Sequence, residues 1–286
     1  MRIPQLRHVY ASLAEFNDTL VSGGSAVLTS AANNARKLEI LDEVSRLIDF
    51  KAHRGTGFGP WVGSLSYDGD GMDVLWLRAD LADLETLSVR SAVGSTPSTP
   101  AVDTDFYLAG IGSYELPYRK IILHGEGDPT RFGCGPKLID IDGTWSYPYR
   151  TRVLSGTTAE ALDSSETEVD VSALTGLSAG MTILIDSEQM YVTATTDSTT
   201  DSITVERGVN GTTAATHLTS APITRFVYAP SVHTLALRLA EKRWKARDQG
   251  GDGSDGGGDV GTISLREGED TIIRRMLGPI QLTGYV

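Results

Sequence analysis

The sequence predicts an α+β protein: a small helical bundle, made of the first long helix and a late helix, with an intervening β region, an inserted small β module and an extended C-terminal arm. Apolar residues follow a helical period in residues 31–53 and 231–248. Between these segments, residues 61–153 consist of short strand-like runs and turns, and residues 154–229 form a second strand-rich stretch that is poor in aromatic residues and rich in Thr and Ser. This change of amino-acid composition predicts that the second stretch is a separate module inserted into the chain.

The N-terminal part is predicted to contain two helices. Residues 10–21 form the shorter one, in which Ser12 and Glu15 have the spacing of a capping box. The longer helix is capped by Thr29 or Ser30. Its apolar stripe consists of Ile40, Leu41, Val44, Leu47 and Ile48.

The late helix is predicted to begin at the cap residue Ser231. Its buried face consists of Val232, Leu235, Ala236, Leu239, Ala240 and Trp244, and its last turns carry a basic cluster of Lys242, Arg243, Lys245 and Arg247. Cations at this end suit the negative pole of the helix dipole, so we expect a solvated helix end in preference to a DNA contact.

The strands of the first β region are indicated by apolar runs at Val74–Leu77 and Ile121–Leu123 and by alternation over Leu138–Asp142. The dipeptides Asp68-Gly69 and Asp142-Gly143 predict tight turns. Strands of the inserted module are predicted at residues 169–171, 181–185, 190–193 and 203–206.

These patterns predict five parts of the chain. Residues 1–153 are the first part of a helical and β core, residues 154–229 are the inserted module, and residues 230–249 are the late helix that completes the core. A flexible Gly/Asp-rich linker over residues 250–262 precedes a C-terminal docking arm over residues 263–286. In this arm Ile272, Ile273, Met276 and Leu277 surround Arg274 and Arg275. We expect the arm to order by docking on another surface.

Composition excludes several classes of protein. The net charge of −12 argues against a surface that grips nucleic acid throughout, although an acidic lining would let DNA slide past. The single cysteine, Cys134, excludes an internal disulfide. No apolar run reaches the length of about 18 residues that a membrane span needs, and the N-terminus lacks a signal-peptide core, so we expect assembly in a cytoplasm without a membrane.

Motifs of enzymes and of ion sites are weak. Ser178 lies in a Gly-x-Ser-x-Gly pattern, but a strand is predicted after it where a hydrolase elbow needs a helix. The Gly251–Gly256 stretch lacks the context of a dinucleotide fold, the aspartates around it lack a complete calcium loop, and the histidines are scattered. The sequence therefore predicts no catalytic residue, no cofactor and no metal.

Several stretches together resemble the head–tail connector (adaptor) proteins of long-tailed bacteriophages. Residues 10–16 (YASLAEF) resemble the opening helix of that family, and residues 45–49 (SRLID) resemble its first long helix. Residues 67–81 look like its hairpin, and residues 116–119 and 141–148 look like its later strands. Residues 185–190 and 206–212 are similar to a β unit common in phage structural proteins.

This resemblance implies a non-enzymatic structural protein of the virion. The subunits would form a homo-oligomeric ring, usually a dodecamer, under the portal protein, where the ring extends the DNA channel and receives a stopper or tail-completion protein. DNA would pass through without sequence-specific binding. Family members embed a C-terminal segment in the portal, so portal docking is expected at Ile272, Ile273, Arg274, Arg275, Met276 and Leu277.

Two other functions stay open on the sequence. The Thr/Ser-rich module could be a β binding module of a tail tip or capsid surface. A phage hydrolase that uses Ser178 is the remaining alternative.

Overall fold

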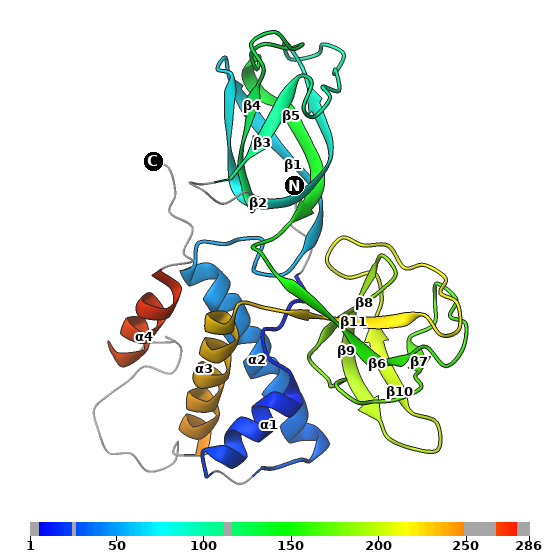
Figure 1. Cartoon of the computed structure of the whole chain (residues 1–286). Coiled ribbons are helices and arrows are strands. Elements are labelled where there is room, and N and C mark those ends of the chain that lie inside the picture. The colour runs from blue at the N-terminus through cyan, green and yellow to red at the C-terminus, as the bar shows by residue number, and fades with distance from the viewer. Residues whose placement is uncertain (1–5, 25–26, 111–115, 249–266, 279–286) are drawn as a thin grey trace. The chain divides into compact units, whose positions relative to one another are not determined.

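A computed structural model describes residues 6–24, 27–110, 116–248 and 267–278, and the chain divides into two compact units (Figure 1). The first unit consists of Gly55–Tyr149 with Leu6 and Asn210–Thr212, and the second contains the helices and the strand-rich module. The boundary predicted after residue 153 lies close to Arg150, where the second unit resumes. The prediction grouped residues 1–153 as one core, whereas Gly55–Tyr149 form a unit with their own core.

The first unit is a five-stranded antiparallel sheet with the strand order β1-β5-β2-β4-β3. Its strands are β1 (Trp61–Asp70), β2 (Val74–Val89), β3 (Phe106–Ala109), β4 (Tyr118–Leu123) and β5 (Cys134–Trp145). Alternate residues of these strands point into a shared apolar core that includes Leu81, Ile121, Ile141 and Trp145. The predicted apolar runs therefore lie in strands, as expected.

Both dipeptides predicted to be tight turns lie inside strands instead. Asp68-Gly69 belongs to β1, at a shift in its register with β5, and Asp142-Gly143 belongs to β5. A Cβ atom at Gly143 would lie 2.3 Å from the carbonyl oxygen of Asp83 on β2. Gly143 thus permits close approach of β2 and β5, and such close approach is a common reason for a glycine inside a strand.

The helices of the second unit are α1 (Leu13–Ser22), α2 (Ala31–Lys51), α3 (Pro230–Asp248) and α4 (Glu267–Leu277). α3 contacts each of the other three helices. Two predicted caps are confirmed: Ser12 and Glu15 form a complete capping box on α1, and the Ser30 hydroxyl accepts a hydrogen bond from the Asn33 amide on α2. Ser231 is not the cap of α3, because the helix begins one residue earlier at Pro230, whose missing N–H and fixed φ suit a first helical position.

The module in the second unit is a six-stranded antiparallel sheet with the order β6-β11-β8-β9-β10-β7. Its strands are β6 (Arg150–Thr157), β7 (Glu168–Asp170), β8 (Thr182–Ile185), β9 (Glu188–Thr196), β10 (Ser202–Glu206) and β11 (Pro222–Val227). The four strands predicted in this module are confirmed within a few residues. Helices and two antiparallel sheets in one chain confirm the α+β class.

Candidate functional site

The predicted docking residues lie on a helix and not on an extended arm. α4 packs on α3 and also contacts α2. Ile273 and Leu277 are 2% and 1% exposed, because this apolar edge of α4 faces its own chain. The expectation of an extended arm is therefore wrong for residues 267–277. Residues 263–266, 279–286 and the predicted linker 250–262 lie outside the described residues.

The opposite face of α4 is open to solvent. Ile272 is 41% exposed, Arg274 and Arg275 are exposed, and Met276 is half-buried. The six predicted docking residues therefore divide into two groups. One group holds α4 on the bundle, and the other forms a face that a partner could reach.

The basic cluster at the end of α3 is largely engaged within the chain. The Arg243 guanidinium lies 2.8 Å from the Glu43 carboxylate on α2. The Lys245 ammonium donates to Glu241 at 2.7 Å and lies 3.4 Å from the carbonyl oxygen of Gly23. Lys242 is half-buried, and the side chain of Arg247 lies outside the described residues. Arg243 and Lys245 thus join α3 to neighbouring segments, in place of the solvated helix end that the sequence predicts.

Two stretches that carry the family resemblance meet in the helical part. The Tyr10 backbone N–H donates to the Ser45 hydroxyl at 3.1 Å, and the Tyr10 hydroxyl donates to the buried Asp49 carboxylate. Arg46 completes the contact with an ion pair of 2.9 Å to Asp49 and a hydrogen bond to the carbonyl oxygen of His8. The segment before α1 is thereby fixed against the last turns of α2, a contact that the sequence did not reveal.

A pocket of about 210 Å³ adjoins the first turn of α1. Its polar lining centres on Glu15, which lies 3.4 Å from His233 Nε2 on α3 and 3.6 Å from Arg225 on β11. Burial alone would raise the pKa of Glu15, but the nearby His233 ring and the hydrogen bonds from Ser12 lower it to about 2. The same carboxylate is the capping-box acceptor of α1, so its ionisation supports the local helix start.

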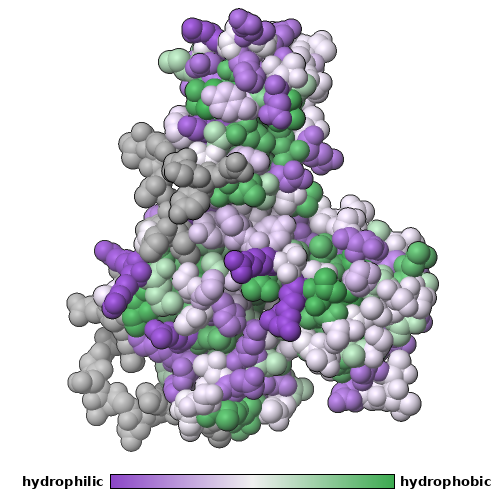
Figure 2. Space-filling view, in the orientation of Figure 1, coloured by the Kyte–Doolittle hydropathy of each residue, from purple (hydrophilic) through white to green (hydrophobic). Residues whose placement is uncertain are grey.

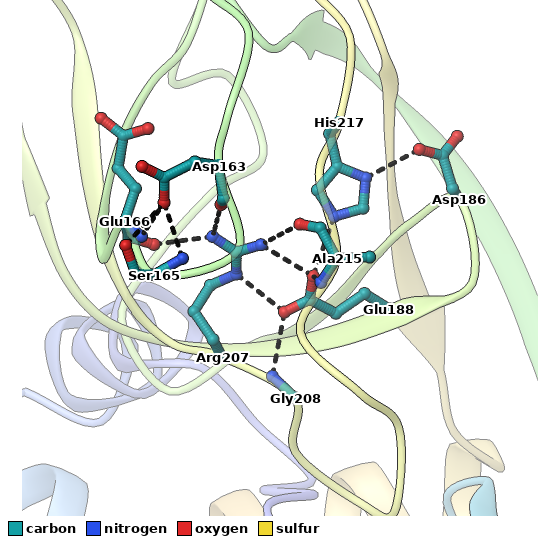
Figure 3. Close-up of polar contacts among 9 residues, drawn as sticks. All are labelled: Asp163, Ser165, Glu166, Asp186, Glu188, Arg207, Gly208, Ala215 and His217. Carbon is teal, nitrogen blue, oxygen red and sulfur yellow. Dashed lines mark hydrogen bonds and ion pairs between the residues drawn. The ribbon is translucent and has the colours of Figure 1, made fainter.

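The densest polar cluster among the described residues lies in the β module, at Glu188 (Figure 3). Arg207 Nε lies 2.7 Å from Glu188 Oε1, and Arg207 Nη2 lies 2.8 Å from Glu188 Oε2. The Gly208 and Ala215 amides each donate to the same carboxylate at 2.9 Å. His217 lies between two acids, with Nε2 2.8 Å from Glu188 and Nδ1 2.7 Å from Asp186.

The remaining donors of Arg207 are also satisfied. Nη1 donates to the carbonyl oxygens of Asp163 and Glu166, and Nη2 donates to the carbonyl oxygen of Ala215. Burial would raise the pKa of Glu188, but the hydrogen bonds of Arg207, Ala215 and the other donors lower it to about 2. Every polar group at the centre is thus paired, which is the arrangement of a structural ion network and fixes the loops between the strands.

Ser178, the candidate hydrolase nucleophile, has a structural contact. Its hydroxyl oxygen accepts a hydrogen bond from the backbone N–H of Ala14, in the first turn of α1, at 3.1 Å. The side chain is buried, and strand β8 follows where a nucleophile elbow would require a helix. Ser178 therefore satisfies one of the orphan amides of α1.

Other acidic side chains that could suggest an ion site have ordinary roles where they are described. Asp68 accepts from the Lys137 amide and Asp70 from the Met72 amide, so both serve as backbone acceptors. Among the described residues no three His, Cys, Asp or Glu side chains are grouped to hold a metal ion, and Cys134 is an exposed thiol. The aspartates of the Gly-rich stretch, Asp252, Asp255 and Asp259, lie outside the described residues.

Within the parts of the chain that are described, no helix is long and apolar enough to cross a membrane. Comparisons of the chain with protein families, with characterised proteins and with solved structures found no match.

Proposed function

We propose that this chain is a structural head–tail connector (adaptor) subunit of a tailed phage. In this role copies of the chain assemble into a ring beneath the portal, extend the DNA channel, and offer a landing surface to the stopper or tail. The ring, usually twelvefold in the family that the sequence resembles, would be part of the virion and would assemble in the host cytoplasm.

The observation that carries the proposal is the contact between the two helical stretches that resemble this family. Tyr10 reaches Ser45 and Asp49 through hydrogen bonds, so the opening segment and the first long helix form one unit. α3, from the far end of the chain, packs against both α1 and α2. The β parts lie in sequence between α2 and α3, so segments far apart in the chain form one helical bundle, as the periodicity of the sequence predicts.

The net negative charge of the chain supports a channel that lets DNA pass without binding it. The chain has 37 acidic and 25 basic residues. Several of the basic side chains, including Arg207, Arg119 and Arg243, are held in internal ion pairs. A surface that keeps this acidic excess repels phosphate, and DNA would move along it without being bound.

Portal contact is proposed for the exposed face of α4. Ile272 would supply apolar contact and the exposed cations Arg274 and Arg275 would face acids of the portal. Ile273 and Leu277 hold α4 on α3, so in this proposal they orient the docking face and do not fill a portal groove.

The test is binding of the purified full chain to the portal ring of the same virus, observed by co-sedimentation and negative-stain microscopy. We expect an added ring on one end of the portal. The double variant Arg274→Glu, Arg275→Glu should weaken binding about tenfold or more, whereas Arg36→Glu, an exposed charge reversal on α2, should leave it unchanged. A chain that neither forms a ring nor binds the portal would exclude the proposed function.

A further inference from the structure

The first unit exposes two parallel rows of side chains across β3, β4 and β2. In one row Tyr107 lies opposite Ile122, and Ile122 lies opposite Val74. In the other row Ala109 lies opposite Lys120, and Lys120 lies opposite Trp76. Residues two apart on a strand point to the same face, so both rows belong to one surface of the sheet. We call these six residues the Trp76 face.

The Trp76 face is mostly apolar, and Lys120 on the central strand β4 makes it cationic. Trp76 and Tyr107 are 45% and 40% exposed. The Lys120 ammonium lies 5.3 Å from the Trp76 ring centroid, and Arg78, which follows Trp76 on the same side of β2, is exposed. Neither row contains an acidic residue. Figure 2 shows apolar residues interleaved with hydrophilic ones on the surface of this unit.

The residue types favour a protein partner over a nucleic acid. Exposed Trp, Tyr and Arg are the residues that most often dominate protein–protein binding energy. A platform for nucleic-acid bases would place aromatic rings next to one another along a cationic groove, whereas here the aliphatic Ile122 and Val74 fill the row beside Tyr107. Because Lys120 and Arg78 are positively charged, a complementary partner surface is acidic.

A second copy of this chain offers such a surface in its β module. Glu160 is exposed, and repulsion from Asp170, followed by burial and Glu166, raises its pKa, so like charges lie close together in this segment. Next to this segment Leu218 is 80% exposed, and its carbonyl oxygen accepts a hydrogen bond from the Thr158 hydroxyl. An exposed leucine beside clustered acids complements a surface that combines aromatic rings with the cations Lys120 and Arg78.

We infer that the Trp76 face of one copy binds the acidic segment around Glu160 and Leu218 of the next copy. Because the two surfaces differ, the contact is heterologous and repeats from copy to copy until the assembly closes. The six residues would form the centre of a larger interface, since a standard interface contains about 20–30 residues on each side. The inference deepens the proposed ring assembly and rests on it for the closed geometry, but the pairing of surfaces can be tested separately.

Trp76 is itself a probe of this contact. The chain has four tryptophans, and Trp61, Trp145 and Trp244 are buried, so Trp76 is the one that acrylamide can quench readily. Sedimentation velocity of the full chain over a concentration series would be combined with acrylamide quenching. We expect self-association, with Trp76 protected from quenching in the associated form. A chain that stays monomeric, or that associates with Trp76 still quenchable, overturns the inference.

Substitutions give the second arm of the test. Trp76→Ser, Tyr107→Ser and Lys120→Glu should each weaken association about tenfold or more, and Val93→Ser, at a site 73% exposed in the same unit but outside the two rows, should not. The double variant Lys120→Glu, Glu160→Lys should regain association that Lys120→Glu loses, since every contact in the assembly then has its charges exchanged. Folding of each variant is checked by its melting curve.

The outcomes separate this inference from the proposed function. Rings formed normally by Trp76→Ser would reject the Trp76 face as the contact while leaving the connector role standing. Association through this face into a species that is not a ring, without portal binding, would reject the connector role and retain the contact. Binding of single-stranded nucleic acid that Trp76→Ser abolishes would show that the assigned partner is wrong.

Discussion

Glu188 and Arg207 form a two-pronged ion pair in the core of the β module, with both side chains almost completely removed from solvent. They are 19 residues apart, on the first residue of β9 and just after β10. β9 and β10 are hydrogen-bonded neighbours in the six-stranded sheet. Together with His217, the pair fixes the loop of residues 207–217 to the sheet.

Arg207→Met should destabilise the module strongly. The substitution leaves the Glu188 carboxylate buried without its main partner, and the loss of one member of a buried pair costs about 3–5 kcal/mol. Hydrogen exchange of the amides in β8, β9 and β10 would measure the change locally. Arg152→Met, on the exposed part of β6, is the matched control and should change stability by less than about 0.5 kcal/mol. If the amides of β8, β9 and β10 were equally protected from exchange in both variants, the Glu188–Arg207 pair would not stabilise the module.

The stability of the module should decrease in acid. The pKa of Glu188 is lowered from 4.5 to about 2 in the folded protein, so the folded state favours the ionised form. Its contribution is fully present above pH 4.5 and is lost as the pH falls through about 2, and by linkage it amounts to about 3 kcal/mol. Urea unfolding between pH 7 and pH 2 would measure this loss. Glu188→Gln should be less stable at neutral pH and should show a smaller decrease in acid.

Features encoded in a few neighbouring residues were predictable from the sequence. The capping box of Ser12 and Glu15 is confirmed, and Ser30 is the cap of α2 among the two candidates Thr29 and Ser30, because a cap needs only residues within one turn. The periodicity of α2 and α3 was equally local. Dipeptides were less informative, since the glycine of Asp142-Gly143 admits a neighbouring strand and does not form a turn.

Features that depend on long-range packing were not predictable. Glu188, Arg207 and His217 become neighbours only when three strands and two loops are in place, so no spacing in the sequence points to them. α4 was missed because a Gly-rich stretch of sequence precedes it. A signal was nevertheless present: Ile273, Met276 and Leu277 have the three- and four-residue spacing of a helix, and Arg274 and Arg275 suit the last turn of one.

Ser178→Ala should affect stability and leave no enzymatic phenotype. The Ser178 hydroxyl accepts the Ala14 amide at the start of α1, and loss of such a capping contact costs about 1 kcal/mol. Thermal unfolding would measure the loss, and Ser155→Ala, at an exposed position of β6, is the control. A screen with ester substrates accompanies it. An esterase activity present in the natural chain and absent from Ser178→Ala would restore the hydrolase alternative.

Adjacent isoleucines on α4 provide the sharpest test of how this helix is held. Ile273 is buried against the bundle and Ile272 is 41% exposed, so the same substitution at the two positions has different consequences. Ile273→Ala should cost about 2–5 kcal/mol of local stability, because it leaves a cavity in packed apolar surroundings, whereas Ile272→Ala should cost less than about 1 kcal/mol. Hydrogen exchange of the amides of α4 reports the difference. If both variants exchange alike, α4 is not anchored through Ile273, and the division of α4 into an anchoring edge and an accessible face would be wrong. If only Ile273→Ala releases the helix, portal binding by Ile272→Ala then measures the exposed face without disturbing the fold beneath it.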